Sequence, residues 1–320
     1  MAWQIGIDEA GYGPNLGPFV MTLVACRVPD KLHRSCLWKL LKKKIRRADE
    51  DADGRMVVAD SKLVYAPTSG WCDLEKSVLA AHAGGFFAPS ATLHDLLGDL
   101  AHGDVPSLRG ETWFVGDTPL PTEVEPDAAA EAIDSWRAVS ASADVAWGFC
   151  RSVIVPAPRF NELIDKWDSK SAVLSVAVTQ LMRQCVEHTA AEPMRFVIDK
   201  HGGRNTYSAL LQEAFCEGMV LAEEEGRMRS VYRVVGLDRS VQIVVTPKAD
   251  VENFTVSLAS MFSKYVRELL MREFNRFWKS HIPDLKPTAG YPSDASRYFD
   301  EIRPTLAKLG ISERAVWRCR

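Results

Sequence analysis

Short apolar runs alternate with amphipathic stretches along the chain, which is the pattern of a protein that mixes strands with helices. Apolar or β-branched runs predict strands over residues 3–7, 19–27, 56–59, 146–155, 195–198, 231–235 and 241–245. Apolar residues at helical spacing predict helices over residues 31–47, 70–83, 161–188, 205–217 and 251–278. Because strands and helices are interspersed throughout, the pattern favours an α/β fold.

Residues 84–144 differ in character from the rest of the chain. They are rich in glycine, proline and alanine, and they contain eleven acidic but only two basic residues. This change predicts an acidic insertion or small subdomain within a main domain of residues 1–83 and 145–280, followed by a helical tail over residues 281–320. Because an acidic segment repels phosphates, we expect it to cover a face, bind a protein partner or regulate access.

The net charge of −3 conceals a basic stretch. Residues 31–47 carry eight Lys or Arg and no acidic residue, so the expected helix either presents a solvated face or tracks a nucleic-acid backbone. The seven cysteines form no C-x-x-C pair, which argues against a disulfide scaffold or a structural zinc site. The apolar run over residues 19–26 has the length of a strand, and the opening residues lack a basic leader. These features predict a cytoplasmic protein without a membrane span.

Acidic residues recur where short apolar runs end, at Asp8, Asp60, Asp199 and, a few residues after its strand, Asp250. Carboxylates from several strand ends can converge on one edge of a sheet, and their oxygens suit hard cations such as Mg²⁺ or Mn²⁺. Each has a simpler interpretation as well. Asp8 with Glu9, or Asp199, could form a polar turn, and Asp250 could cap the following helix.

The glycines of residues 6–18 invite comparison with phosphate-binding loops. Their spacing does not fit G-x-G-x-x-G, and an apolar strand follows where a helix should begin. The chain also lacks a G-x-x-x-x-G-K-[ST] motif. Neither a dinucleotide-binding fingerprint nor a P-loop is therefore indicated.

Five blocks of the sequence resemble the ribonuclease HII, or type 2 RNase H, family. They are D-E-A-G-Y-G-P-N-L-G-P, V-A-D-S-K-L, V-I-D, K-A-D followed by S-L-A-S-M-F-S-K-Y-V-R-E, and the late G-Y, in that order along the chain. The resemblance covers most of the chain apart from residues 84–144. It implies an RNase H-like fold with a central mixed β-sheet flanked by helices. It also implies cleavage of the RNA strand of RNA–DNA hybrids with Mg²⁺ or Mn²⁺, leaving 3′-hydroxyl and 5′-phosphate ends.

Carried onto this sequence, the resemblance assigns catalysis and metal binding to Asp8, Glu9, Asp199 and Asp250. It assigns substrate binding to Gly11, Tyr12, Gly13, Lys62, Ser257, Lys264 and Tyr291. Ser257, Ser260 and Lys264 would share one helical stripe suited to a phosphate, although a solvated face is the alternative. Lys62 could equally be a surface lysine, and Tyr291 could serve packing instead of stacking on a sugar or base.

The sequence also departs from the family. Tyr12 stands where the family has an arginine between two glycines, in a loop that reads the 2′-hydroxyl at the RNA–DNA junction largely through its backbone. A basic, Gly-rich turn over residues 200–204 could bind phosphate or simply reverse the chain. A second D-S-K at residues 168–170 is interpreted as an exposed turn or cap. Two alternatives therefore stay open: a nucleic-acid-binding protein with lost or altered catalysis, and a metal-dependent nuclease for another substrate.

Overall fold

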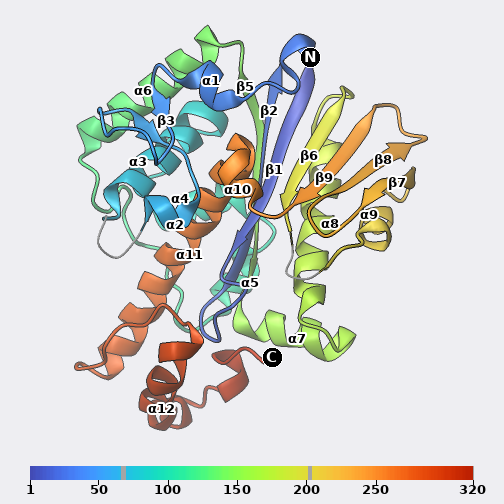
Figure 1. Cartoon of the computed structure of the whole chain (residues 1–320). Coiled ribbons are helices and arrows are strands. Elements are labelled where there is room, and N and C mark those ends of the chain that lie inside the picture. Colours follow the sequence, from blue (N-terminus) through green and yellow to red (C-terminus); the bar gives the residue numbers. More distant parts are fainter. Residues whose placement is uncertain (66–69, 201–203, 320) are drawn as a thin grey trace.

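A computed structural model describes residues 1–65, 70–200 and 204–319. Seven strands form one sheet in the order β5-β2-β1-β6-β9-β8-β7 (Figure 1). β1 and β6 are parallel, as are β6 and β9, and the remaining pairs are antiparallel. The predicted α/β class with a central mixed sheet is therefore confirmed. The strands are β1 (Ala2–Ala10), β2 (Phe19–Val28), β5 (Ala146–Val155), β6 (Met194–Asp199), β7 (Met219–Glu225), β8 (Ser230–Val235) and β9 (Val241–Thr246).

Helices cover both faces of the sheet. One face packs against α11, and the helices α3, α4, α6 and α12 join the same hydrophobic cluster. The other face packs against α7, α8 and α9 (Figure 1). The helices are α1 (Leu37–Leu41), α2 (Ser61–Val64), α3 (Cys72–Ala81), α4 (Leu93–Leu100), α5 (Val105–Arg109), α6 (Pro126–Ser142), α7 (Ala157–Trp167), α8 (Ser171–His188), α9 (Ser208–Ala214), α10 (Ala249–Glu252), α11 (Phe254–His281) and α12 (Pro292–Leu309).

The alternation of side chains along the central strands divides the core into two layers. In β1, Ile5 and Ile7 face the layer of α8, whereas Gly6 faces α11. A Cβ atom at Gly6 would lie only 2.2 Å from the backbone carbon of Thr255, so α11 can approach β1 this closely only over a glycine. This contact brings the first turns of α11 beside Asp8, the next residue of β1 on the same face.

Two of the sequence-based boundaries need correction near the start of the chain. The strand predicted over residues 3–7 continues to Ala10, so Asp8 and Glu9 are paired strand residues and not a polar turn. The helix predicted over residues 31–47 is wrong except for α1. Ile45–Arg46 (β3) instead pairs in parallel with Met56–Val57 (β4), and this short ladder buries Ile45, Met56 and Val57.

Two long predicted helices are each divided. The helix expected over residues 161–188 consists of α7 and α8, because Asp168 adopts the left-handed conformation at the end of α7. The second D-S-K is therefore a turn, as predicted. The helix expected over 251–278 consists of α10 and α11, and the side chain of Asn253 caps α11 by accepting from the Val256 N–H at 3.3 Å. Asp250 lies inside α10 and is not its cap.

The acidic segment over residues 84–144 packs into the same hydrophobic cluster as α11. Two fully buried carboxylates fasten it there. Glu273 of α11 accepts from the N–H groups of Val115 and Gly116 at 3.1 Å. Glu75 of α3 accepts from the backbone N–H groups of residues 122, 123 and 124 at 2.7–2.9 Å. The division into a main domain, an insertion and a tail stays a prediction. Within the described residues, no helix is long and apolar enough to cross a membrane.

Candidate active site

A hollow of about 320 Å³ opens where β1, β6, α10 and α11 meet. Ten of the residues selected from the sequence line it, together with Ala10, Pro14, Ser61, Ser260 and Arg267. Those ten are Asp8, Glu9, Gly11, Tyr12, Gly13, Lys62, Asp199, Asp250, Lys264 and Tyr291. They come from six separate places in the sequence, and Ser257 is the one selected residue that does not line the hollow.

The parallel pairing of β1 with β6 places two of the carboxylates side by side. Ile7 is the register partner of Ile198, so Asp8 and Asp199 follow at the same edge of the sheet. Asp199 is oriented by the start of α10, where the Ala249 N–H donates to its Oδ1 at 2.9 Å. The same turn places Asp250 in the hollow, so three different elements deliver acids to one point.

The carboxylates destabilise one another's charged forms. Burial first, and the charge of Glu9 second, hold the pKa of Asp8 well above its usual value. Burial and then Asp199 raise the pKa of Glu9 to about 7. Burial raises the pKa of Asp199, and burial followed by the charges of Asp60 and Asp199 raises the pKa of Asp250 to about 6. A buried cluster of this kind gains free energy when a cation neutralises it.

Lys62 contributes a positive charge at the rim. Burial alone would lower its pKa, but the charges of Asp60, Asp250 and Asp8 outweigh this effect and raise it. Asp60 itself accepts from the Lys62 backbone N–H at 2.9 Å and caps α2. Asp60 is therefore the N-cap of α2, and its charge acts on Lys62 together with the charges of the acids in the hollow.

Three serines of α11 serve the site in different ways. The Ser263 hydroxyl donates to the Asp8 carbonyl at 3.0 Å, and Ser260 bonds to the Ser61 hydroxyl at 3.0 Å. Ser257 is fully buried, and its hydroxyl donates to the carbonyls of Asp250 at 2.5 Å and Asn253 at 3.0 Å. The expected contact of Ser257 with substrate is therefore corrected: this hydroxyl joins α10 to α11.

Two further selected residues line the same hollow. Lys264 forms an ion pair with Glu268 at 2.8 Å, and both side chains are mostly buried. Tyr291 is 45 % exposed, and the Arg267 guanidinium lies 5.8 Å from the centre of its ring. The ring therefore contacts a guanidinium and also exposes part of its surface to solvent, so a sugar or base could stack on it.

Among the lining residues that were not assigned a role from the sequence, Arg267 is the one that carries a charge. Arg267 lies within the fourth of the five sequence blocks, one helical turn after Lys264 on α11. This spacing was the signal that could have identified it. Of the basic turn over residues 200–204, residues 201–203 lie outside the described residues. Lys200 donates to the Asn205 side chain at 2.7 Å and to the Arg227 carbonyl at 2.5 Å.

The donor set suits a hard divalent cation because it consists of carboxylate oxygens without cysteine or histidine. Among the described residues, no three His, Cys, Asp or Glu side chains are already arranged closely enough to hold an ion. A bound cation would therefore have to draw the carboxylates closer together. The raised pKa values of Glu9 and Asp250 mean that their charged forms are destabilised in the hollow, so a cation that neutralises them would lower the electrostatic free energy of the site.

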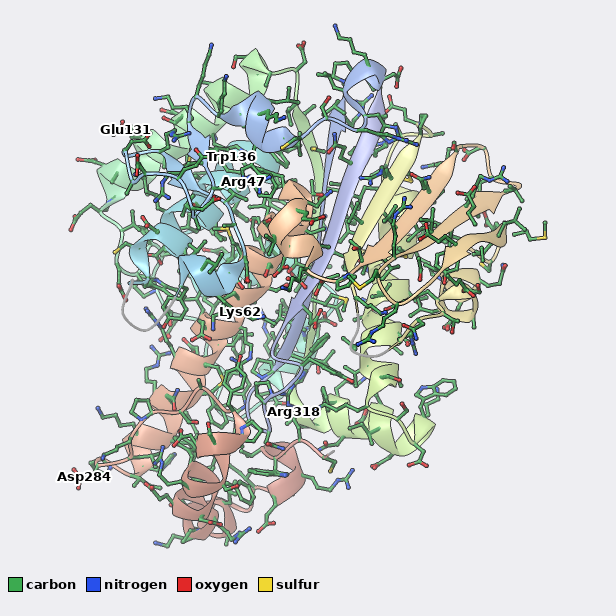
Figure 2. The ribbon with its side chains drawn as sticks, in the orientation of Figure 1. Arg47, Lys62, Glu131, Trp136, Asp284 and Arg318 are labelled. Carbon is green, nitrogen blue, oxygen red and sulfur yellow. The ribbon has the colours of Figure 1, made fainter. Side chains whose placement is uncertain are left out.

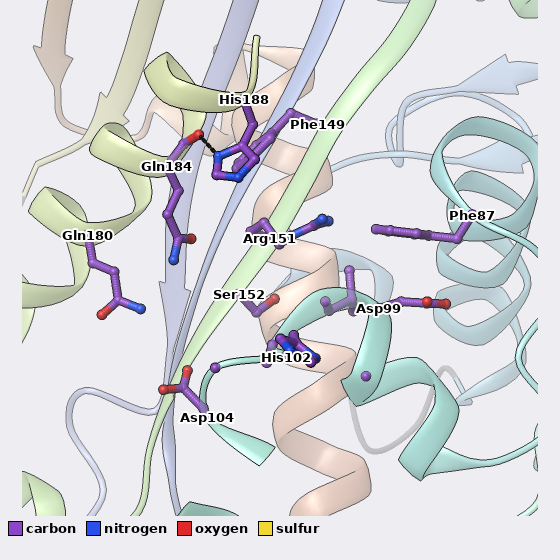
Figure 3. A pocket seen from close by; sticks show the side chains of 14 residues that line it. Phe87, Asp99, His102, Asp104, Phe149, Arg151, Ser152, Gln180, Gln184 and His188 are labelled. Atoms are coloured by element: carbon purple, nitrogen blue, oxygen red, sulfur yellow. Dashed lines mark hydrogen bonds between the residues drawn. The ribbon is translucent and has the colours of Figure 1, made fainter. Parts of the chain in front are cut away.

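A second, larger hollow of about 490 Å³ lies along β5, between the loop after α4 and the helix α8 (Figure 3). The Arg151 guanidinium lies over the rings of Phe87 and Phe149, at 5.3 and 5.4 Å. Its acids are already engaged, since Asp99 lies 3.2 Å from the His82 ring and Asp104 accepts from the Ile154 N–H at 2.8 Å. It contains none of the residues selected from the sequence.

No family model and no curated protein sequence matches the chain. Solved structures are similar at low identity. RNase HII of Archaeoglobus fulgidus, solved in complex with PCNA, is 16 % identical over 99 % of this chain and 94 % of that chain, with a TM-score of 0.44. Ribonuclease H2 of Pyrococcus horikoshii OT3 is 14 % identical over 98 % and 92 %, with a TM-score of 0.45. Bst-RNase HIII in complex with Mn²⁺ is 14 % identical over 99 % and 66 %, with a TM-score of 0.44. The similarity to these type 2 RNase H structures is distant.

Proposed function

We propose that this chain is a metal-dependent endonuclease that cleaves the RNA strand of RNA–DNA hybrids. The observation that carries the proposal is the meeting of Asp8, Glu9, Asp199 and Asp250, from three elements, in one hollow that also holds two lysines. Paired carboxylates of this kind are the ligands that a two-ion phosphodiester hydrolysis needs. The order of the sequence blocks supports the choice of substrate.

The four carboxylates would hold Mg²⁺ or Mn²⁺. When bound, such ions supply an activated water and neutralise charge at the scissile phosphate, which is consistent with 3′-hydroxyl and 5′-phosphate products. The chain's own groups prepare the site for them. The Ala249 N–H orients the Asp199 carboxylate by a hydrogen bond, and Ser263 holds the backbone carbonyl of Asp8, so both acids start from defined positions when a cation draws them together.

The remaining side chains of the hollow would position the nucleic acid. Lys62 and Lys264 line the same hollow as the acids, where their ammonium groups can contact backbone phosphates. The open face of Tyr291 can stack on a sugar or base next to the cleaved bond. Each of these contacts acts on the nucleic-acid backbone or on a π-face, so none of them selects a base sequence.

The test is cleavage of three labelled duplexes: a full RNA strand on DNA, a single ribonucleotide within DNA, and plain DNA. Each is incubated with Mg²⁺ or Mn²⁺ and wild-type protein, Asp8→Asn, or the control Asp284→Asn. Asp284 is exposed and lies far from the hollow (Figure 2). We expect the wild type and the control to cut the hybrid, and Asp8→Asn to lose at least about 1,000-fold in rate, equivalent to about 4 kcal/mol of transition-state stabilisation.

The same panel separates the competing functions. Retained cleavage by Asp8→Asn would contradict the proposed role of the carboxylates. Tight binding of the hybrid without cleavage of any duplex would indicate a binding protein with lost catalysis. Cleavage of plain DNA alone would indicate a nuclease for another substrate.

A further inference from the structure

Two arginines lie buried beneath the Gly11–Pro14 loop that forms one wall of the hollow. Arg267 of α11 and Arg318, from the segment after α12, each expose 1 % of their surface. The Arg318 guanidinium lies 4.5 Å from the centre of the Phe160 ring of α7. Figure 2 shows Arg318 at the lower end of β1, between α11 and α7. Buried cations of this kind need a structural or functional reason.

Arg318 holds the loop by its backbone. Its Nη2 donates to the Gly11 carbonyl at 2.7 Å and to the Pro14 carbonyl. Its backbone N–H donates to the Asn15 carbonyl at 2.8 Å. On the other side of the loop, the Asn15 N–H donates to the Gly290 carbonyl at 2.8 Å. The loop is therefore fixed in orientation by two segments that are distant in sequence.

This fixation determines which way a peptide N–H points. The carbonyl of Gly11 and the N–H of Tyr12 belong to one planar trans peptide and point in opposite directions. Because Arg318 holds the carbonyl from the buried side, the Tyr12 N–H is directed away from Arg318. Gly11, Tyr12 and Gly13 line the hollow and Arg318 does not, so the free side of this peptide is the side of the hollow.

The arginine pair also leaves positive charge beneath the loop. The Nε of Arg267, and the Nε and Nη1 of Arg318, have no hydrogen-bond partner in the described part of the chain. The acid beside Arg267 is Glu268, whose Oε1 is 3.5 Å from Arg267 Nη1 and is shared with Lys264. Burial and then the charge of Arg267 lower the pKa of Arg318 to about 9, so it is still charged at neutral pH.

We propose that Arg318 is a positioning residue that holds the Gly11–Pro14 loop so that the Tyr12 amide donates to a phosphate oxygen of the substrate. The excess positive charge of Arg267 and Arg318 favours an anionic oxygen at this point over a neutral hydroxyl. The identity of the substrate rests on the proposed function above, whereas the positioning of the loop does not depend on it.

Hydrogen exchange of the loop tests the positioning. We compare the full-length wild type with Arg318→Gln, with Arg318→Lys and with the control Arg314→Gln. Arg314 lies on the same segment but pairs with the exposed Asp165. The Asn15 amide should exchange at least about tenfold faster in Arg318→Gln, because the carbonyls of Gly11 and Pro14 lose their donor. The control should match the wild type, and Arg318→Lys should lie between the two.

Unchanged exchange in Arg318→Gln would overturn the proposal. If that variant fails to fold by circular dichroism, Arg318→Lys decides, since it retains a buried cation but removes the guanidinium whose Nη2 donates to both carbonyls. If neither variant folds, Arg318 is a residue of the fold alone and the positioning role is refuted.

Binding without cleavage tests the phosphate contact. In the Asp8→Asn background, the dissociation constant for an RNA–DNA hybrid should rise about tenfold on Arg318→Gln, and the slope of log Kd against log salt should fall by about one. An unchanged Kd and slope would overturn the phosphate contact. If the Asp8→Asn parent and the wild type bind no hybrid at all, the proposed function fails, and the exchange measurement alone decides the role of Arg318.

Discussion

Replacing Glu9 by Gln should stabilise the metal-free protein, and it should do so mainly at neutral to alkaline pH. Burial and the charge of Asp199 raise the pKa of Glu9 from 4.5 to about 7. A carboxyl group whose pKa is higher in the folded state weakens the fold as the pH rises from the unfolded value to the folded value, and the full penalty persists above it. Glutamine has nearly the same shape without the charge, so the substitution removes the penalty.

The magnitude follows from the two pKa values. Their difference corresponds to about 3 kcal/mol at roughly 1.36 kcal/mol per unit. Allowance for the solvent-accessible part of this partly buried side chain reduces it to roughly 2 kcal/mol. With an unfolding entropy of about 2.1 cal/mol/K per residue, a chain of 320 residues gains about 3 °C in Tm at pH 8. At pH 5 the folded state is largely protonated at Glu9, and the gain falls below about 1 °C.

The assay is thermal unfolding at pH 5 and pH 8 in buffer with a chelator. Glu131→Gln, which removes an exposed carboxylate on α6, is the matched control and should change the Tm by less than about 1 °C at both pH values. Added Mn²⁺ at pH 8 should raise the Tm of the wild type more than that of Glu9→Gln. An equal loss of stability at both pH values in Glu9→Gln would refute the reasoning, because it would mean that Glu9 contributes contacts rather than repulsion.

Three further outcomes are expected. At subsaturating Mg²⁺, the cleavage rate should rise with pH between about 5 and 8. Protons compete with the metal ion at Asp250 and Glu9, whose pKa values are about 6 and about 7. A rate that does not change with pH would contradict this. Gly6→Ala should lower the free energy of unfolding by about 3 kcal/mol or more in chemical denaturation, because its Cβ would lie 2.2 Å from the Thr255 backbone. Glu75→Ala should cost about 3 kcal/mol by leaving buried N–H donors without a partner, and a change below about 1 kcal/mol would refute that role.

The sequence was sufficient to predict the fold class and most strands. The strand over residues 146–155 was predicted with the bounds of β5, because its β-branched and aromatic residues, which end in the buried run Val153–Val155, are typical of a strand. The strand β7 was missed because its residues are mostly exposed and three of them are glutamates. The basic stretch at 31–47 was misread because lysines satisfy a helical pattern and a solvated loop equally well.

The candidate site was predictable to a similar extent. Acids at the ends of β1 and β6 could be expected to meet because parallel neighbours end at one edge. The burial of Ser257 could not be expected, since it depends on the break between α10 and α11 at Asn253. The position of Arg318 beneath the loop also had no local signal, because the two segments are about 300 positions apart in sequence and meet only through tertiary packing.

The backbone contact between Gly6 and Thr255 also bears on how the protein can change over evolution. Where interlocking side chains set the distance between a strand and a helix, that distance changes when core residues are replaced, because the helix shifts to accommodate the new side-chain volume. Here two main chains touch directly, so the separation of β1 from α11 is independent of side-chain volume. Substitutions elsewhere in the core can therefore accumulate without moving Asp8 relative to α11. Divergence of most of the sequence is compatible with a constant geometry at this one point.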